Sequence, residues 1–333
     1  MIIVTGANGF IGSNVVRALR YRNGHDVLAV DVLPSISDVT RPMPHVVEAR
    51  YETPHPTINW LDMDALPAWL AKARANVSGI IHLGALSDTT LTDRQRVLRH
   101  NLEYTRTLWQ WATAVGCPLL YASSAATYGD GTRGYSDEAD PRQFTPLNLY
   151  AESKHDFDLW ALTQTATPPR WIGLKFFNVY GPGEVHKGHM ASVAYHAFNQ
   201  VRETGRVRLF RSHREGIADG HQRRDFIHVA DAVDATLHFL TSPPTPLAPN
   251  GLYNIGTGTA RTFEDVARCV IAATGGHAHI EYIDMPEHLR AKYQYFIEAT
   301  VAKLRRAGFE RSMLSIEQGI GRYVAHLMLA RAA

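Results

Sequence analysis

Several classes of protein are excluded by what this sequence lacks. Only two cysteines, Cys117 and Cys269, occur among 333 residues, so a disulfide framework is excluded and a reducing compartment fits. The net charge is +2, which provides no strong field for binding nucleic acid or a membrane surface. No uninterrupted apolar run is long enough to span a bilayer, and no basic-then-apolar leader precedes the first strand. We therefore expect a cytoplasmic protein with no nucleic-acid and no membrane partner.

Internal repeats and low-complexity tracts are absent as well. Hydrophobic residues make up 45% of the chain and charged residues 20%, which is ordinary for a folded, soluble protein. The length allows one large domain or two modest ones. The motifs must therefore carry any inference about function.

The first twenty residues, MIIVTGANGFIGSNVVRALR, have the pattern of a strand, a tight turn and a helix. Gly6, Gly9 and Gly12 punctuate the turn, where a Cβ would keep a phosphate from the backbone N–H groups of the helix N-terminus. A second strand, DVLAVD, ends at Asp31, an acid suited to bind the hydroxyls of an adenosine ribose. Together these features predict a dinucleotide-binding unit.

The choice between NAD and NADP stays open on these residues. Asp31 would repel a 2′-phosphate and so favours NAD, whereas Arg41 is close enough in sequence to reach back to such a phosphate.

Strand and helix patterns alternate through the first half of the chain, which predicts an α/β fold with a Rossmann-type doubly wound parallel sheet. The pattern changes after about residue 180, where strict alternation is lost. We therefore expect an NAD(P)-binding domain over residues 1–178, with segments around 225–258 returning to it. Residues 179–333 would form a smaller, mainly discontinuous C-terminal α/β substrate lobe over the carboxyl ends of the strands. Residues 93–115 have the spacing of one helix, Thr262 is placed to cap another, and residues 212–222 are predicted to be a mobile loop.

Ser124, Tyr150 and Lys154 have the residue types of an acid/base device. Tyr150 and Lys154 lie one helical turn apart and share a face, and Ser124 ends a predicted strand at the nucleotide-binding edge. A lysine beside a tyrosine favours the phenolate and lowers the pKa of the tyrosine. Such a tyrosine can exchange a proton with a substrate hydroxyl while hydride moves to or from nicotinamide, and the serine can hold the same oxygen.

The segments TGANGFIG, YASSAATYG, LYAESK, FFNVYGPG and RRDFIHVADA together resemble the extended short-chain dehydrogenase/reductases that act on nucleotide sugars. Two further segments, FNVYGPGEVHKGHMASVAYH and IEYIDMPEHLRAKYQYFIEAT, are similar to the ADP-L-glycero-D-manno-heptose 6-epimerase family, whose members serve lipopolysaccharide core synthesis. The resemblance covers nearly the whole chain. It implies an isomerase that inverts C6 of a nucleotide-linked heptose by transient oxidation to a 6-keto sugar and re-reduction with bound NAD(P).

The resemblance also implies roles for individual residues. Tyr150 and Lys187 would be the two acid/base groups, one for each face of the ketone, while Ser124 and Lys154 assist them. The residues expected to bind cofactor are Gly6, Gly9, Phe10, Ile11, Gly12, Asp31, Val32, Leu83, Gly84, Ala85, Ser87, Asn101, Tyr150, Lys154 and Val179. Those expected to bind the nucleotide sugar are Ser124, Asn178, Lys187, His189, His196, Phe210, Arg224 and Tyr293. Family relatives assemble, so a homo-oligomer is expected.

The chain departs from the family pattern in three places. His189 stands where a small serine is usual, and the segment RSHREGIADGHQ after Phe210 is long and different in character. The residues after Asp31 lack the lysine and asparagine that hold the 2′-phosphate of NADP. These departures bear on the cofactor phosphate and on the identity of the sugar nucleotide, whereas Tyr150 and Lys187 are both present.

Other functions are weighed against this one. Another nucleotide-sugar 4-epimerase or reductase would need changes around residues 210–224, where the chain departs from the family. A dehydratase would carry an Asp-Glu pair next to a threonine at the strand end, and the matching stretch here, SSAATYG, has no acid. A non-catalytic NAD(P) sensor or scaffold would not need both Tyr150 and Lys154. A metal site is not expected, because no acid or cysteine completes one with His186 and His189.

Overall fold

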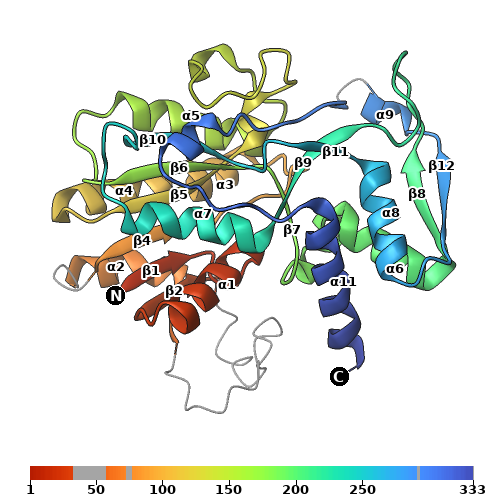
Figure 1. The fold of residues 1–333 in the computed structure, drawn as a ribbon. Coiled ribbons are helices and arrows are strands. Elements are labelled where there is room, and N and C mark those ends of the chain that lie inside the picture. The colour runs from red at the N-terminus through yellow and green to blue at the C-terminus, as the bar shows by residue number, and fades with distance from the viewer. Residues whose placement is uncertain (33–57, 73–76, 291–292, 333) are drawn as a thin grey trace.

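The computed structural model describes residues 1–32, 58–72, 77–290 and 293–332 (Figure 1). Arg41 and the other residues that follow Val32, up to residue 57, lie outside the described residues.

A seven-stranded sheet forms the centre of the larger part of the molecule, with the order β10-β6-β5-β4-β1-β2-β3. Every neighbouring pair is parallel. The order reverses between β1 and β4, the switch point at which doubly wound sheets bind dinucleotides. The predicted Rossmann-type fold is confirmed. Its strands are β1 (Ile2–Thr5), β2 (Val27–Asp31), β3 (Asn59–Asp62), β4 (Gly79–His82), β5 (Leu119–Ser124), β6 (Trp171–Phe176) and β10 (Gly251–Ile255).

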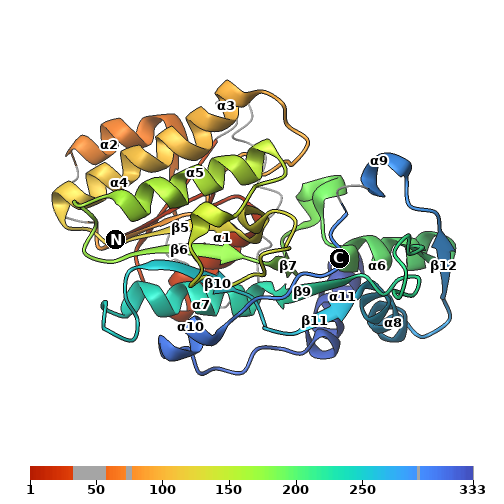
Figure 2. The ribbon, with the colours of Figure 1, turned by 90° about the horizontal axis from the view of Figure 1, so that it is seen from above.

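Helices cover both faces of this sheet (Figure 2). One face packs against α1 (Phe10–Arg17), its π-helical continuation η1 (Ala18–Arg22) and α7 (Val229–Thr241), and the other against α2 (Leu66–Lys72), α4 (Tyr104–Val115) and α5 (Leu149–Thr163). The strands are mostly apolar because side chains on both of their faces are buried. Between Asp93 and Val115 the predicted helix is divided into α3 (Arg94–Leu98), a π-helical turn η4 (Arg99–Glu103) and α4.

A smaller part of the molecule lies beyond the carboxyl ends of the large sheet. It holds a sheet of β7 (Asn178–Tyr180), β9 (Arg223–His228) and β11 (Ala260–Thr262), and the parallel pair β8 (Arg206–Phe210) and β12 (His279–Ile283). Its core forms where α6 (Val193–Thr204), α8 (Phe263–Ala273) and α11 (Ile316–Ala332) pack on these strands. Thr262 caps α8 through a reciprocal capping box with Asp265, as predicted.

The remaining short elements connect these layers. They are η3 (Met63–Ala65), η5 (Ala125–Tyr128), η6 (Pro141–Gln143), η7 (Val185–Met190), α9 (Glu287–Arg290) and α10 (Ala302–Arg306). Strand β10 and helix α7 join the large sheet from late in the chain, whereas β9 belongs to the smaller one. The division at residue 178 stays a prediction.

Residues 212–222 are folded back onto the end of β8 by several hydrogen bonds. The Gly220 N–H donates to the Phe210 carbonyl at 3.1 Å, and the Ser212 N–H donates to the Asp219 carboxylate at 2.8 Å. The segment predicted to be a mobile loop therefore has a defined internal structure. Within the described part of the chain, no helix is long and apolar enough to cross a membrane.

Candidate active site

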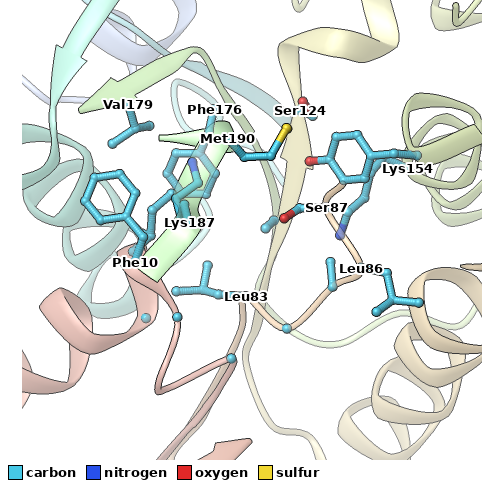
Figure 3. Close-up of a pocket in the computed structure, with 18 of the residues that line it drawn as sticks. Phe10, Leu83, Leu86, Ser87, Ser124, Lys154, Phe176, Val179, Lys187 and Met190 are labelled. Atoms are coloured by element: carbon cyan, nitrogen blue, oxygen red, sulfur yellow. The ribbon is translucent and has the colours of Figure 1, made fainter. Parts of the chain in front are cut away.

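A cavity of about 770 Å³ opens at the carboxyl ends of β1, β2, β4, β5 and β6 (Figure 3). Parallel strands end at the same edge of the sheet, so the residues that follow each strand converge there. The structure brings most of the predicted site residues to this cavity: Gly6, Gly9, Phe10, Ile11, Gly12, Asp31, Val32, Leu83, Gly84, Ala85, Ser87, Ser124, Tyr150, Lys154, Asn178, Val179 and Lys187.

The glycine turn after β1 has room for backbone only. A Cβ on Gly12 would lie 1.9 Å from the Gly6 carbonyl oxygen, and one on Gly6 would lie 2.6 Å from the Gly84 nitrogen. Gly6 also has φ +66°, a left-handed conformation that favours glycine. Helix α1 starts directly after this turn, so its free N–H groups face the cavity edge. These residues fit the diphosphate of a dinucleotide.

Asp31 holds its place at the end of β2 through two backbone donors. The Asn8 N–H donates to Oδ2 and the Val32 N–H donates to Oδ1, both at 2.8 Å. The carboxylate thus links the glycine turn to the adjacent strand end. Its remaining lone pairs can accept hydrogen bonds from ribose hydroxyls.

Tyr150 and Lys154 lie on α5, opposite Ser124 at the end of β5. Burial raises the pKa of Tyr150 and is the largest influence, while a hydrogen bond with Ser124 lowers it. Burial also lowers the pKa of Lys154 to about 8. The net pKa of Tyr150 is raised because its loss of hydration outweighs the hydrogen bond with Ser124, and a lowering of this pKa by Lys154 stays a prediction.

Lys187 enters the cavity from η7, a segment between β7 and α6. Its Nζ lies 5.4 Å from the centre of the Phe10 ring, and burial lowers the pKa of the amine. In Figure 3, Lys187 lies on the opposite side of the cavity from Ser124 and Lys154, with Met190 between them. The amine of Lys187 and the Ser124–Lys154 side of the site are therefore separated by the cavity.

Asn101 does not line the cavity but stands behind its wall. Its side chain accepts from the Leu86 N–H at 2.8 Å and donates to the Leu86 carbonyl and to Ser153 Oγ, each at 3.0 Å. It thereby holds residues 83–87 in place. Its neighbour His100 and, one turn earlier, Arg96 reach the cavity instead. Sequence reasoning missed both, although their four-residue spacing on a helix places them on one face.

A second pocket, about 130 Å³, shares Val193 and Phe263 with the main cavity. His196, Phe210 and Tyr293 line it, as expected for a substrate region. Arg224 is buried with its guanidinium 5.4 Å from the ring centres of both Phe263 and Tyr293, and burial lowers its pKa. His189 is exposed on η7, where its carbonyl lies 3.2 Å from His196 Nε2.

Among the described residues, no group of three or more His, Cys, Asp or Glu side chains is arranged to hold a metal ion. The cavity is instead suited to an elongated organic ligand with phosphates near the glycine turn.

Comparisons with known proteins agree with this geometry. Residues 2–256 match the model of the NAD dependent epimerase/dehydratase family. The ADP-L-glycero-D-manno-heptose-6-epimerase of Fusobacterium nucleatum is 42% identical, with 98% of each chain covered. That of Nitratidesulfovibrio vulgaris is also 42% identical, over 99% of this chain and 98% of the relative. A crystal structure of the Helicobacter pylori enzyme of the same name has a TM-score of 0.78 at 23% identity, covering 98% of this chain and 96% of that one.

The two sequence relatives cover at least 98% of this chain at 42% identity. The chain therefore belongs to the NAD dependent epimerase/dehydratase family and, within it, to the ADP-L-glycero-D-manno-heptose-6-epimerases.

Proposed function

We propose that this protein inverts C6 of ADP-D-glycero-D-manno-heptose by oxidising the carbinol to a ketone and reducing it from the other face. The observation that carries the proposal is that Ser124 and Lys154 lie on one side of the cavity and Lys187 on the other, with Tyr150 hydrogen-bonded to Ser124 and a cradle for a dinucleotide next to them. Bound NAD(P) would accept the C6 hydride and return it. Epimerisation then needs no net oxidant, because the same hydride goes back.

Tyr150 would exchange the proton of the C6 hydroxyl on one face, with the Ser124 hydroxyl holding the same oxygen. Lys187 would exchange it on the other face, since it lies on the opposite side of the cavity from Ser124 and burial lowers the pKa of its amine, which favours the neutral form that accepts a proton. Lys154 would hold the ribose next to the nicotinamide. Arg224, stacked between two rings, would bind the substrate diphosphate, because guanidinium pairs with phosphate bidentately.

The test uses ADP-D-glycero-D-manno-heptose carrying deuterium at C6, incubated with the purified protein and followed by NMR. We expect both epimers to form with the deuterium retained, since hydride stays on the cofactor between the two steps. Washout of deuterium into solvent would contradict hydride transfer. Tyr150→Phe should reduce turnover about 10²- to 10⁴-fold, the usual contribution of a general acid/base.

The rival functions give different results in the same assay. A 4-epimerase or reductase of the same superfamily would leave this heptose unchanged and act on another nucleotide sugar. A non-catalytic sensor would bind NAD(P) but convert no sugar, and Tyr150→Phe would leave its function untouched.

The cofactor phosphate is a separate question. Asp31 at the end of β2 favours NAD, while Arg96 adds positive charge to the same cavity and would favour NADP. Titrations of the cofactor-depleted protein with NAD and with NADP would decide between them. Assembly into a homo-oligomer and a cytoplasmic location stay predictions, testable by light scattering and by cell fractionation.

A further inference from the structure

A buried ion pair lies beneath the serine of the site. Lys175 Nζ, on β6, is 2.7 Å from Asp158 Oδ2, on α5, and the two side chains are 2% and 0% exposed. Removing two charges from water costs free energy that their attraction does not reliably return. A role in fixing geometry is therefore a better explanation for the pair than a gain in stability.

Asp158 fixes the strand on one side of Ser124. The Ser123 hydroxyl donates to Asp158 Oδ2 at 2.6 Å, and the Tyr121 hydroxyl donates to Oδ1 at 2.9 Å. Both donors belong to β5, whose last residue is Ser124. One carboxylate therefore holds the final residues of this strand against α5.

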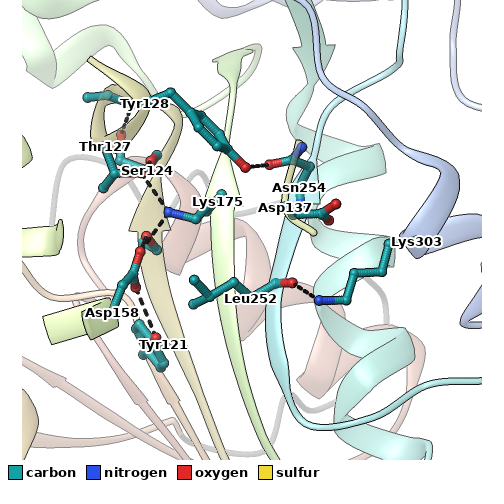
Figure 4. A network of polar contacts seen from close by, with 12 residues as sticks. Tyr121, Ser124, Thr127, Tyr128, Asp137, Asp158, Lys175, Leu252, Asn254 and Lys303 are labelled. Carbon is teal, nitrogen blue, oxygen red and sulfur yellow. Dashed lines mark hydrogen bonds and ion pairs between the residues drawn. The ribbon is translucent and has the colours of Figure 1, made fainter. Parts of the chain in front are cut away.

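Lys175 fixes the chain on the other side of Ser124. Its ammonium group donates to Thr127 Oγ1 at 2.6 Å, and the Thr127 hydroxyl donates in turn to the Ser124 carbonyl at 2.7 Å (Figure 4). The ring of Tyr128 lies below the same ammonium group, 5.0 Å from Nζ to the ring centre. The backbone on both sides of Ser124 is thus tied to one ion pair.

The same pair also reaches the tyrosine. Asp158 follows Lys154 by four residues and Tyr150 by eight, so the three side chains lie along one face of α5. Moving Asp158 relative to β5 would therefore move Tyr150 relative to Ser124.

We propose that Lys175 and Asp158 are positioning residues that set the approach of the Ser124 hydroxyl to the Tyr150 hydroxyl. The inference rests on the proposed function for the chemical roles of Ser124 and Tyr150. The charge of Asp158 supports it, since it raises the pKa of both Lys154 and Tyr150, in each case after the larger influence of burial.

The first experiment compares Lys175→Met with Lys175→Arg in the epimerase assay. Methionine keeps the apolar length of the side chain but loses both hydrogen bonds. Because a misplacement of reacting groups by about 1 Å can slow a reaction about 100-fold, kcat should fall about 10- to 100-fold. KM and cofactor Kd should change less than about 3-fold, since neither Lys175 nor Asp158 lines the cavity. Arginine can donate to Asp158 and Thr127 together and should recover most of the lost kcat. Equal activity of Lys175→Met and wild type would overturn the proposal.

Lys303→Met is the matched control. Lys303 is also largely withdrawn from water, and its Nζ donates to the Leu252 carbonyl at 2.7 Å on β10, away from β5 (Figure 4). Its loss should lower the melting temperature but leave kcat within about 3-fold. A fall in kcat as large as that of Lys175→Met would mean that the lysine acts through general stability, which would overturn the proposal.

A double-mutant cycle with Ser124→Ala separates positioning from a structural role. If Lys175 acts through Ser124, Lys175→Met should cost less than about 3-fold once Ser124 is alanine. Multiplicative losses would overturn the proposal. Should Lys175→Met fail to fold, Thr127→Val removes the bonds of this hydroxyl to Lys175 Nζ and to the Ser124 carbonyl while leaving the Lys175–Asp158 ion pair in place. It is expected to lower kcat about 10-fold with the same dependence on Ser124.

Crystal structures of the wild type and of Thr127→Val decide the inference without any substrate. Ser124 Oγ should move by about 1 Å or more relative to the Tyr150 hydroxyl, a displacement of the size that impairs proton transfer. An unmoved Ser124 would overturn the inference. A wild type that does not convert the heptose would instead overturn the proposed function, and the displacement would still be measured.

Discussion

The pKa of Lys154 sets a pH dependence at the scale of a single residue. Burial lowers the pKa of this amine to about 8, so it is charged below pH 8 and neutral above it, well before an exposed lysine would be. If Lys154 holds the ribose next to the nicotinamide as proposed, its charged form donates the stronger hydrogen bonds. We therefore expect cofactor Kd to be constant at lower pH and to rise as the pH passes through about 8, measured by fluorescence titration.

Lys154→Met is the control for this pH dependence. It should bind cofactor more weakly and show no change in Kd around pH 8, because the titrating group is gone. A wild-type Kd that stays level well above that pH would contradict the assignment.

Two glycines predict opposite effects of the same substitution. Gly12→Ala places a Cβ 1.9 Å from a backbone oxygen, which the turn cannot accommodate. It should abolish cofactor binding and lower the free energy of unfolding by more than about 2 kcal/mol, measured by urea denaturation. Gly321→Ala, in α11, meets no atom within 4 Å and should leave stability unchanged or raise it by about 0.5–1 kcal/mol. Similar destabilisation of both variants would show that the turn is not the cause.

Site residues could be predicted where their chemistry is local in sequence. The glycine turn, Asp31, Tyr150 and Lys154 all line the cavity, as expected. Asn101 and His100 are adjacent in sequence, yet only His100 reaches it. Both residues lie in the π-helical turn η4, and the Asn101 side chain instead bonds to Leu86 and Ser153 from other segments, which a local pattern does not specify.

At the scale of an element, the segment that carries Lys187 is held by one buried acid. The Glu184 carboxylate accepts from the Gly181 N–H at 3.1 Å and from the Ser192 hydroxyl at 2.7 Å, which joins the two ends of the segment. The Lys187 N–H donates to the Glu184 carbonyl at 2.9 Å. Glu184→Ala should release the segment, so that trypsin cleaves after Lys187 faster and kcat falls about 10- to 100-fold.

Glu203→Ala on α6 is the control for this prediction, because Glu203 is exposed. It should change neither trypsin sensitivity nor kcat beyond about 2-fold, as surface substitutions usually do. If Glu184→Ala had the trypsin cleavage rate and the kcat of the wild type, the conformation of the segment would not depend on the Glu184 carboxylate.

Whether a segment forms a helix, a strand or a loop was more predictable than the tertiary hydrogen bonds that the segment makes. Buried strands and the capped helix α8 carry their signals in their own residues, whereas the position of residues 212–222 is set by bonds to Phe210 and to the start of α8 that no local pattern specifies. A polar, glycine-containing segment predicts only that a loop exists.

At the scale of the whole molecule, the site is assembled from both sheets. Ser124, from the large sheet, and Phe226, from β9 of the smaller one, both line the main cavity, whereas the buried Arg224 of β9 lies outside the lining of both pockets. If Arg224 binds the substrate diphosphate, Arg224→Met should raise KM about 10- to 100-fold and leave cofactor Kd unchanged, since it removes binding energy from a part of the substrate that does not react.

The neighbouring Arg223 provides a matched control. Successive side chains of a strand point to opposite faces, and Arg223 is exposed where Arg224 is buried. Arg223→Met should leave KM within about 2-fold. A larger effect at Arg223 than at Arg224 would place the diphosphate elsewhere.

The sequence by itself determined the α/β class, the dinucleotide turn and the family, because these depend on contiguous residues whose spacing carries the physical requirement. The tertiary structure decided what stands across the cavity from Tyr150, which residues hold Ser124, and how the aromatic pair around Arg224 is assembled. Those features join residues from separate elements that lie far apart in the sequence, such as Thr127 with Lys175 and Phe10 with Lys187. They depend on how separate elements pack together, and a single sequence carries no local signal for that.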